Sequence, residues 1–199
     1  MWRTSPLLIV VTGLPCSGKS MLAAELRERS GWPLLAKDAF KETLFATLGI
    51  RDRDWSRRLS QASYALMFRM ADELLGRGQS LILEGNFRAA DHDDTFARLL
   101  AQRPVETVQI LCSAEPAVLR QRLQERASRG QRHPGHRDQE TLAELEAEAA
   151  AGPFRPLALQ GPCLQWDSSH PDAQSLAALL AGVTRDPAFQ RASTSSTSV

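Results

Sequence analysis

Residues 13–20 have the sequence Gly13-Leu14-Pro15-Cys16-Ser17-Gly18-Lys19-Ser20, in which two glycines, a lysine and a serine match the pattern G-x-x-x-x-G-K-[ST]. The apolar, partly β-branched residues 7–12 come before it and predict a buried strand. Residues 21–29 come after it and predict a helix, which Ser30 and Gly31 end. A strand, a glycine-containing loop and a helix in this order are the context in which the pattern indicates a phosphate-binding loop.

The residue types of this loop suit the phosphate groups of a nucleotide. Glycine allows backbone conformations that other residues rarely adopt, so that the amides from Cys16 to Ser20 can point together at anionic oxygens. The helix that follows adds the positive end of its dipole. Lys19 is predicted to reach the β- and γ-phosphates of ATP, and the Ser20 hydroxyl to bind Mg²⁺. The alternative is a chance match in a turn, against which the predicted strand and helix argue.

Composition places the chain among ordinary globular proteins. Its 199 residues have a formal net charge of +1, which gives no general attraction to long nucleic acids or anionic membranes. No apolar run has the length of a transmembrane helix, and the first residues lead directly into the predicted strand, so we expect no signal peptide. Three widely spaced cysteines fit no disulfide or zinc pattern. We therefore expect a cytoplasmic protein without membrane association, and no feature indicates an obligate protein partner.

Predicted strands and helices alternate along the rest of the chain. Further strands are expected at residues 32–37, 80–84, 104–112 and 163–167. Helices are expected at residues 39–48, 55–75, 95–102, 113–129, 138–151 and 172–183. This alternation predicts a three-layer α/β/α fold with a five-stranded, mostly parallel sheet. Residues 1–185 would form a single domain, and the Ser/Thr-rich residues 186–199 a disordered tail.

The predicted helix at residues 55–75 contains a recurring apolar pattern. Its apolar members, spaced near the 3.6-residue period of a helix, are Leu59, Ala62, Leu66, Met70 and Leu74. This spacing predicts that they form one face of the helix.

Asp38 follows the second predicted strand, at the edge of a parallel sheet where ligands bind. A carboxylate there could take the proton of an acceptor hydroxyl, or orient it, during phosphoryl transfer. It could also be only the N-cap of the helix at residues 39–48. We favour the catalytic role because a phosphate-binding loop precedes it. Lys37 and Lys41 flank Asp38 and could bind an anionic acceptor, although solvated surface lysines are the commoner case.

Glu84 ends the third predicted strand, which we expect beside the phosphate-binding loop. A carboxylate at this position can hold the hydration shell of magnesium, as Walker-B acids do, so Ser20 and Glu84 form the predicted metal site. The alternative is a strand-end residue exposed to water. Asn86 and Arg88, in the segment that follows, are candidates either for acceptor binding or for loop structure.

Arg122, Arg126 and Arg129 lie at i, i+4 and i+7 and so share one helix face. With Arg132 and the His-Pro-Gly-His turn at residues 133–136, they predict a lid over the triphosphate at residues 120–137, because the guanidinium fork binds phosphate oxygens in pairs. Arg122 and Arg126 are the predicted catalytic arginines, and Arg129 is predicted to contact the nucleotide. A solvated helix face is the alternative. The two histidines of the turn lack the cysteine or carboxylate partners of a metal site.

These segments together resemble those of small P-loop kinases, the adenylate-kinase-like group that contains polynucleotide 5′-hydroxyl kinases, chloramphenicol phosphotransferase, gluconate kinase and zeta-type toxins. The chain is most similar to the AAA_33-type kinase-like family, over residues 7–183. The resemblance makes Asp38 the acceptor-activating carboxylate and the arginines the lid. Glycine is common in that family where Cys16 stands, and aspartate where Glu84 stands. The first difference should leave nucleotide binding intact if Cys16 has an ordinary backbone conformation; the second makes the metal role of Glu84 less firmly supported by the resemblance.

The resemblance implies phosphoryl transfer from ATP with Mg²⁺, without fixing the acceptor. The small net charge favours a hydroxyl of a small molecule, and the alternative is a 5′-hydroxyl polynucleotide kinase, since a nucleic-acid 5′ end needs few phosphate contacts. Two hypotheses of another class are a non-catalytic ATP-binding module and a nucleotide-dependent switch. Loss of Lys19, Asp38 or the arginines would favour the first, but all are present, and the N-K-x-D guanine motif of GTPase switches is absent.

Overall fold

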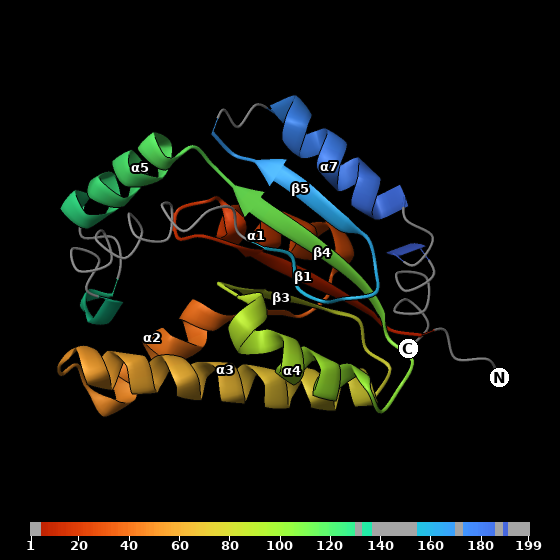
Figure 1. Cartoon of the computed structure of the whole chain (residues 1–199), viewed down its shortest axis with the longest axis horizontal. Helices are drawn as coiled ribbons and strands as arrows, with labels where there is room; N and C mark the ends of the chain where they lie inside the picture. Colours follow the sequence, from red (N-terminus) through yellow and green to blue (C-terminus); the bar gives the residue numbers. More distant parts are fainter. Residues whose placement is uncertain (1–4, 130–132, 137–154, 170–172, 186–188, 191–199) are drawn as a thin grey trace.

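A single parallel sheet organises the chain (Figure 1). The computed structural model describes residues 5–129, 133–136, 155–169, 173–185 and 189–190. The strands are β1 (Leu7–Gly13), β2 (Leu34–Ala36), β3 (Leu81–Gly85), β4 (Glu106–Ser113) and β5 (Cys163–Asp167). They lie in the order β2-β3-β1-β4-β5, and every neighbouring pair is parallel. The predicted five-stranded sheet is confirmed.

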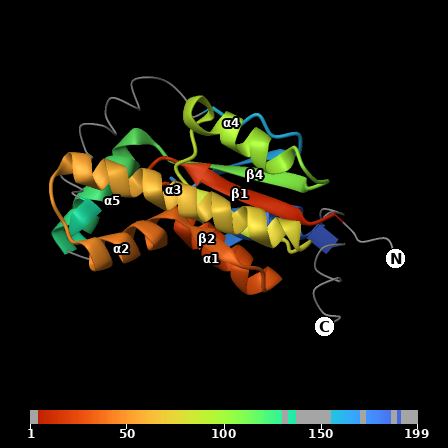
Figure 2. The ribbon, with the colours of Figure 1, turned by 90° about the horizontal axis from the view of Figure 1, so that it is seen from below.

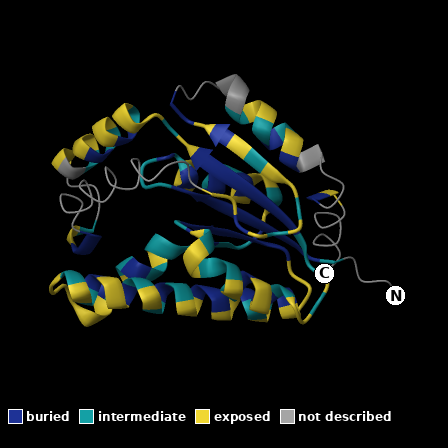
Figure 3. Cartoon of the chain, in the orientation of Figure 1, coloured by how far each residue is buried: buried dark blue, intermediate teal, exposed yellow. Residues whose placement is uncertain are grey.

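Helices cover both faces of this sheet (Figures 1 and 2). They are α1 (Lys19–Ser30), α2 (Lys37–Leu48), α3 (Arg53–Gly76), α4 (Ala89–Leu100), α5 (Pro116–Arg129), η1 (Pro134–His136, a 3-10 helix) and α7 (Ala173–Arg185). Residues 7, 9 and 11 of β1 pack with α1 and α7, whereas residues 8 and 10 pack with α3 and α4. Alternate side chains of the strand therefore enter two separate cores, and Figure 3 shows the central strands of the sheet as buried. The three-layer prediction is confirmed.

Several predictions fall on residues outside this description. They are the helix at residues 138–151, most of the tail at residues 186–199, and the parts of the lid at residues 130–132 and 137. Among the described residues, no helix is both long and apolar enough to cross a membrane.

Four helices, α1, α2, α3 and α4, begin earlier than predicted, α1 at Lys19 rather than at residue 21. Helix α3 begins at Arg53 because the Asp52 carboxylate accepts a hydrogen bond from the Trp55 backbone N–H at 2.8 Å. Helix α4 begins at Ala89 rather than at residue 95. Helix α2 begins at Lys37, so that Asp38 lies in its first turn and Ala36 is the N-cap. The interpretation of Asp38 as only an N-cap is therefore wrong.

The buried face of α3 also differs from the predicted one. Leu66 and Met70 are exposed, at 47% and 44%. The buried positions are Ser56, Leu59, Ser63, Met67, Phe68, Ala71 and Leu75. Two serines belong to this face because their hydroxyls have partners: Ser63 donates to the Leu59 carbonyl at 2.6 Å, and Ser56 to the Gly135 carbonyl at 3.2 Å.

The ends of β1 and β3 are fixed to each other, which positions the site. Thr12 is opposite Gly85 in the sheet. The Thr12 hydroxyl donates to the Phe87 carbonyl at 3.0 Å and accepts from the Phe87 N–H at 2.9 Å. The loop that follows β3 is therefore held beside the beginning of residues 13–20, which we call the phosphate loop.

Candidate active site

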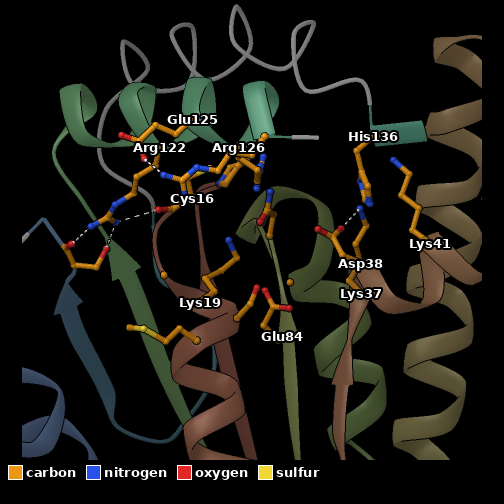
Figure 4. A pocket seen from close by; sticks show the side chains of 18 residues that line it. Cys16, Lys19, Lys37, Asp38, Lys41, Glu84, Arg122, Glu125, Arg126 and His136 are labelled. Carbon is orange, nitrogen blue, oxygen red and sulfur yellow. Dashed lines mark hydrogen bonds and ion pairs between the residues drawn. The ribbon is translucent and has the colours of Figure 1, made fainter. Parts of the chain in front are cut away.

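A cavity of about 560 Å³ opens at the carboxyl ends of the strands (Figure 4). This is the edge at which parallel α/β sheets bind ligands. Its lining comes from five places: the phosphate loop with the start of α1, the end of β3, α2, α5 with η1, and the segment after β5. The predicted site residues in the lining are Pro15, Cys16, Gly18, Lys19, Ser20, Asp38, Glu84, Arg122, Arg126 and Arg129.

The phosphate loop is a tight backbone cradle with no room for extra side chains. Gly13 has φ +148°, and a Cβ there would lie 2.1 Å from the Cys112 carbonyl oxygen. Gly18 has φ +81°, and a Cβ there would lie 2.9 Å from the Trp166 ring. The Ser17 N–H donates to the Leu14 carbonyl at 3.2 Å. Glycine at both positions is thus required by the close approach of β4 and β5.

Cys16 has a left-handed backbone conformation, with φ +64°. The condition stated for Cys16, an ordinary backbone conformation, is therefore not met. A residue with a Cβ pays roughly 1–2 kcal/mol for this region, which explains why glycine suits the position. The Cys16 carbonyl accepts a hydrogen bond from Arg122 Nη1 at 3.2 Å, so α5 contributes to holding the loop in this shape.

Lys19 is buried at the centre of the site. Its side chain is 6% exposed, and Nζ donates to the Leu14 carbonyl at 2.7 Å. Burial lowers the pKa of Lys19, and the nearby Glu84 carboxylate opposes this by favouring the charged form. An anionic ligand in the cavity would favour the ammonium further, so the electrostatics suit a phosphate.

Glu84 and Ser20 could together hold a magnesium ion. Glu84 is 5% exposed, opposite Val11 of β1 and Ala36 of β2, so the alternative of a water-exposed strand end is wrong. Ser20 follows Lys19 in α1, and both oxygen donors line the cavity. A hydroxyl and a carboxylate fit Mg²⁺, which usually takes one or two protein ligands together with water and phosphate oxygens. Within the described ranges, no cluster of three or more His, Cys, Asp or Glu could hold a metal.

Asp38 and its flanking lysines enter the cavity from the first turns of α2. The Lys37 ammonium lies 3.3 Å from Asp38 Oδ1 and 5.7 Å from the centre of the Tyr64 ring. Lys41 is 6% exposed, with Nζ 5.3 Å from the centre of the Phe45 ring. The expectation that these lysines are solvated surface charges is wrong for both, since the Lys37 side chain is only 14% exposed. Asn86 also lines the cavity, whereas Arg88 is exposed at the N-cap of α4.

Arg122, Arg126 and Arg129 of α5 all line the cavity, as their shared helix face predicted. Besides its bond to Cys16, Arg122 donates from Nη1 to Ser168 Oγ at 2.9 Å and from Nη2 to the Ser168 carbonyl. Ser168 in turn donates to the Ser17 carbonyl at 3.1 Å. Arg129 is the most exposed of the three, with Nη2 3.9 Å from Glu125 Oε2. The sequence analysis missed Ser168, although its place directly after β5 could have indicated it.

The turn at residues 133–136 is docked on α2. His136 Nε2 lies 2.9 Å from Glu42 Oε1, and the His133 ring stacks on Phe45 with 5.2 Å between centres. Gly135 is so close to Phe45 that a Cβ would lie 2.7 Å from three ring atoms. Glu42 and Phe45 were not predicted as site residues, because no local pattern connects them with a turn about ninety residues later in the chain.

Comparison with known proteins agrees with this geometry. A model of the AAA domain family AAA_33 matches residues 8–151. The chain belongs to this family. A candidate kinase from Chloroflexus aurantiacus J-10-fl is 39% identical to this AAA_33 protein, with a TM-score of 0.86 over 92% of this chain and 98% of that one. No curated protein matches.

Two further solved structures share the fold at low sequence identity. A sugar kinase from Janibacter sp. HTCC2649 is 17% identical, with a TM-score of 0.59 over 92% of this chain and 98% of that one. A gluconokinase from Sinorhizobium meliloti 1021 is 19% identical, with a TM-score of 0.52 over 94% and 99%. The AAA_33 chain thus has a P-loop kinase-like fold, whose family implies a nucleoside triphosphate and usually Mg²⁺.

Proposed function

We propose that this protein is an ATP-dependent kinase that transfers the γ-phosphoryl group of ATP to a hydroxyl group of a small molecule. The observation that carries the proposal is that Lys19 of the phosphate loop and Asp38 of α2 line the same cavity. A group that binds a triphosphate and a group that can accept a hydroxyl proton therefore face a common space. Its volume, about 560 Å³, is in the range of sites for small molecules.

The nucleotide end of the cavity uses the phosphate loop and α5. The amides from Cys16 to Ser20, the dipole of α1 and Lys19 bind the phosphate oxygens. Arg122 and Arg126 stabilise the charge that develops during transfer, and Arg129 contacts the nucleotide. Arg122 has a second task, because its bond to the Cys16 carbonyl holds the loop. Ser20 and Glu84 would hold Mg²⁺, which neutralises phosphate charge when bound.

The acceptor end uses Asp38. Its side chain is 43% exposed and so accessible from the cavity, and the Lys37 ammonium lies 3.3 Å from its Oδ1. A carboxylate in the first turn of α2 can accept the hydroxyl proton or orient the hydroxyl for in-line attack.

Phosphotransfer from ATP labelled on the γ-phosphate tests this proposal directly. The acceptor panel contains sugars, sugar acids, nucleosides, antibiotics and an oligonucleotide with a 5′-hydroxyl. We expect label in a small molecule, lost in Lys19→Ala. Label in the oligonucleotide alone would contradict the small-molecule acceptor. Tight ATP binding without transfer to any member of the panel would instead support a non-catalytic ATP-binding module.

A further inference from the structure

The distribution of lysine in this chain is unusual. Of the 24 basic residues counted as Lys or Arg, only three are lysines: Lys19, Lys37 and Lys41. All three line the cavity. Everywhere else the chain uses arginine, so lysine is restricted to positions that face one site. A lysine ammonium is a compact point charge, whereas an arginine is a wide planar fork, and the cavity wall at these positions accommodates the compact group.

Lys37 and Lys41 are not part of the nucleotide end. They lie at i and i+4 on α2 and therefore share one helix face, and Asp38 follows Lys37 in the first turn of the same helix. Figure 4 shows both lysines on the α2 side of the cavity with Asp38 and His136, apart from the Lys19 side of the phosphate loop. The positive end of the α2 dipole adds to this charge, and its N-cap, Ala36, has no side chain that could accept hydrogen bonds from the first-turn amides.

The burial of these ammonium groups requires an explanation. A buried charge is costly unless other groups compensate for it. The Lys37 ammonium contacts the Asp38 carboxylate and the Tyr64 ring, and the Lys41 ammonium lies over the face of the Phe45 ring. These contacts fix the positions of the two ammonium groups while both still line the cavity. The lining as a whole contains six lysines and arginines against three carboxylates, although the whole chain is nearly neutral.

From this arrangement we infer that the acceptor carries an oxyanion, a carboxylate or a phosphate ester, which Lys37 and Lys41 bind so that a hydroxyl of the same molecule faces Asp38. The inference rests on the proposed kinase function and adds the chemical class of the acceptor. In the transfer itself the acceptor oxygen forms a bond to the γ-phosphorus, the bond from that phosphorus to the bridging oxygen of ADP breaks, and the hydroxyl proton passes to Asp38. The two lysines are positioning residues: they bind the anionic group of the acceptor.

The small number of lysines makes a direct test possible. Protein labelled with ¹³C at the lysine Cε positions should give three resonances, assigned with the variants Lys19→Arg, Lys37→Arg and Lys41→Arg. The sample is saturated with magnesium and the non-transferable analogue AMPPNP, so that the phosphate loop is occupied. Inorganic phosphate and glycolate are then titrated in separate arms, which distinguishes a phosphate from a carboxylate.

We expect AMPPNP to shift the Lys19 signal. At least one of the two anions should then shift the Lys37 and Lys41 signals, and both signals should saturate with the same dissociation constant. Lys41→Met should weaken this affinity at least tenfold, and Lys41→Arg should weaken it less, because arginine keeps the charge but not the compact shape. Arg57→Gln on the exposed surface of α3 should not change it. If AMPPNP shifts Lys19 but neither anion moves the other two signals, the inference is wrong and the kinase proposal stands. If Lys19 does not respond to AMPPNP, the kinase proposal itself fails.

Discussion

The residue at which α2 begins decides what the Asp38 side chain can do. As an N-cap its carboxylate would be occupied by the amides of α2. In the first turn of the helix it instead lines the cavity and lies beside the Lys37 ammonium. Lys37 and Lys41 of the same helix also line the cavity. The chemistry of the proposed acceptor end therefore depends on α2 beginning at Lys37.

Asp38→Asn keeps the shape of the side chain and removes its ability to accept a proton. We expect binding of ATP to be unchanged and phosphoryl transfer to fall by at least about a hundredfold, the usual contribution of a general base. Labelled-ATP transfer and calorimetry measure the two effects. Asp54→Asn, at an exposed position of α3, is the matched control. Full activity in Asp38→Asn would remove this residue from the mechanism.

Because Lys19 is buried, we expect both the stability of the protein and its binding of nucleotide to depend on pH. The pKa of Lys19 in the folded protein is lowered from 10.5 by burial, so between the lowered value and 10.5 the folded state binds fewer protons than the unfolded state. The stability of the ligand-free protein should therefore rise with pH in this window. A phosphate beside Lys19 favours the ammonium form of its side chain. In this pH window the protein should therefore take up a proton when it binds nucleotide, and the affinity for nucleotide should fall as the pH rises. Calorimetry at alkaline pH in two buffers of different ionisation enthalpy measures the uptake; equal heats would contradict it.

Cys16 offers a test of backbone strain. Cys16→Ala retains a Cβ in the left-handed conformation, whereas Cys16→Gly removes it. We expect the free energy of unfolding of the glycine variant to be about 1 kcal/mol higher than that of the alanine variant. The reason is that the left-handed conformation is unfavourable by about this amount for a residue with a Cβ. Urea unfolding of the two variants measures the difference. Equal stabilities would show that the loop does not store strain at this position.

At the scale of elements, the docking of the turn on α2 completes the acceptor end. The turn contributes His136 to the cavity lining and is held by Glu42, Phe45 and the Ser56 hydroxyl of α3. These contacts come from two helices, so α2 and α3 together provide the surface on which the turn at residues 133–136 lies.

Gly135→Ala should disturb this docking. Its Cβ would lie 2.7 Å from three atoms of the buried Phe45 ring, and we expect a loss of about 1–3 kcal/mol in free energy of unfolding, as for other overpacked sites. The control is Gly182→Ala in α7, where no atom lies within 4 Å of the added Cβ. Alanine there should stabilise the helix by about 0.5–1 kcal/mol. Urea denaturation measures both; a Gly135→Ala variant as stable as the parent would contradict the contact.

At the scale of the whole molecule, local patterns predicted the sheet and failed where contacts are distant. Apolar strand runs and the spacing of the phosphate loop are short-range signals, and the five strands and the shared face of the α5 arginines followed from them. The buried face of α3 did not, because Ser56 and Ser63 are buried through hydrogen bonds that polarity alone does not reveal. The contact of Lys41 with Phe45 is a local i, i+4 pair of α2, but the burial of Lys41 also depends on the other segments around the cavity, which no pattern within α2 indicates.

The phosphate loop, the end of β3 and the first turn of α2 meet only because parallel strands bring their carboxyl ends to one edge. The proposed kinase function depends on that convergence, and nucleotide binding is its first requirement. Calorimetric titration of the protein with AMPPNP in the presence of magnesium tests it most directly. We predict saturable binding of one nucleotide per chain that is lost in Lys19→Ala. The absence of binding to the unmodified protein, or equal binding to the variant, would contradict the account.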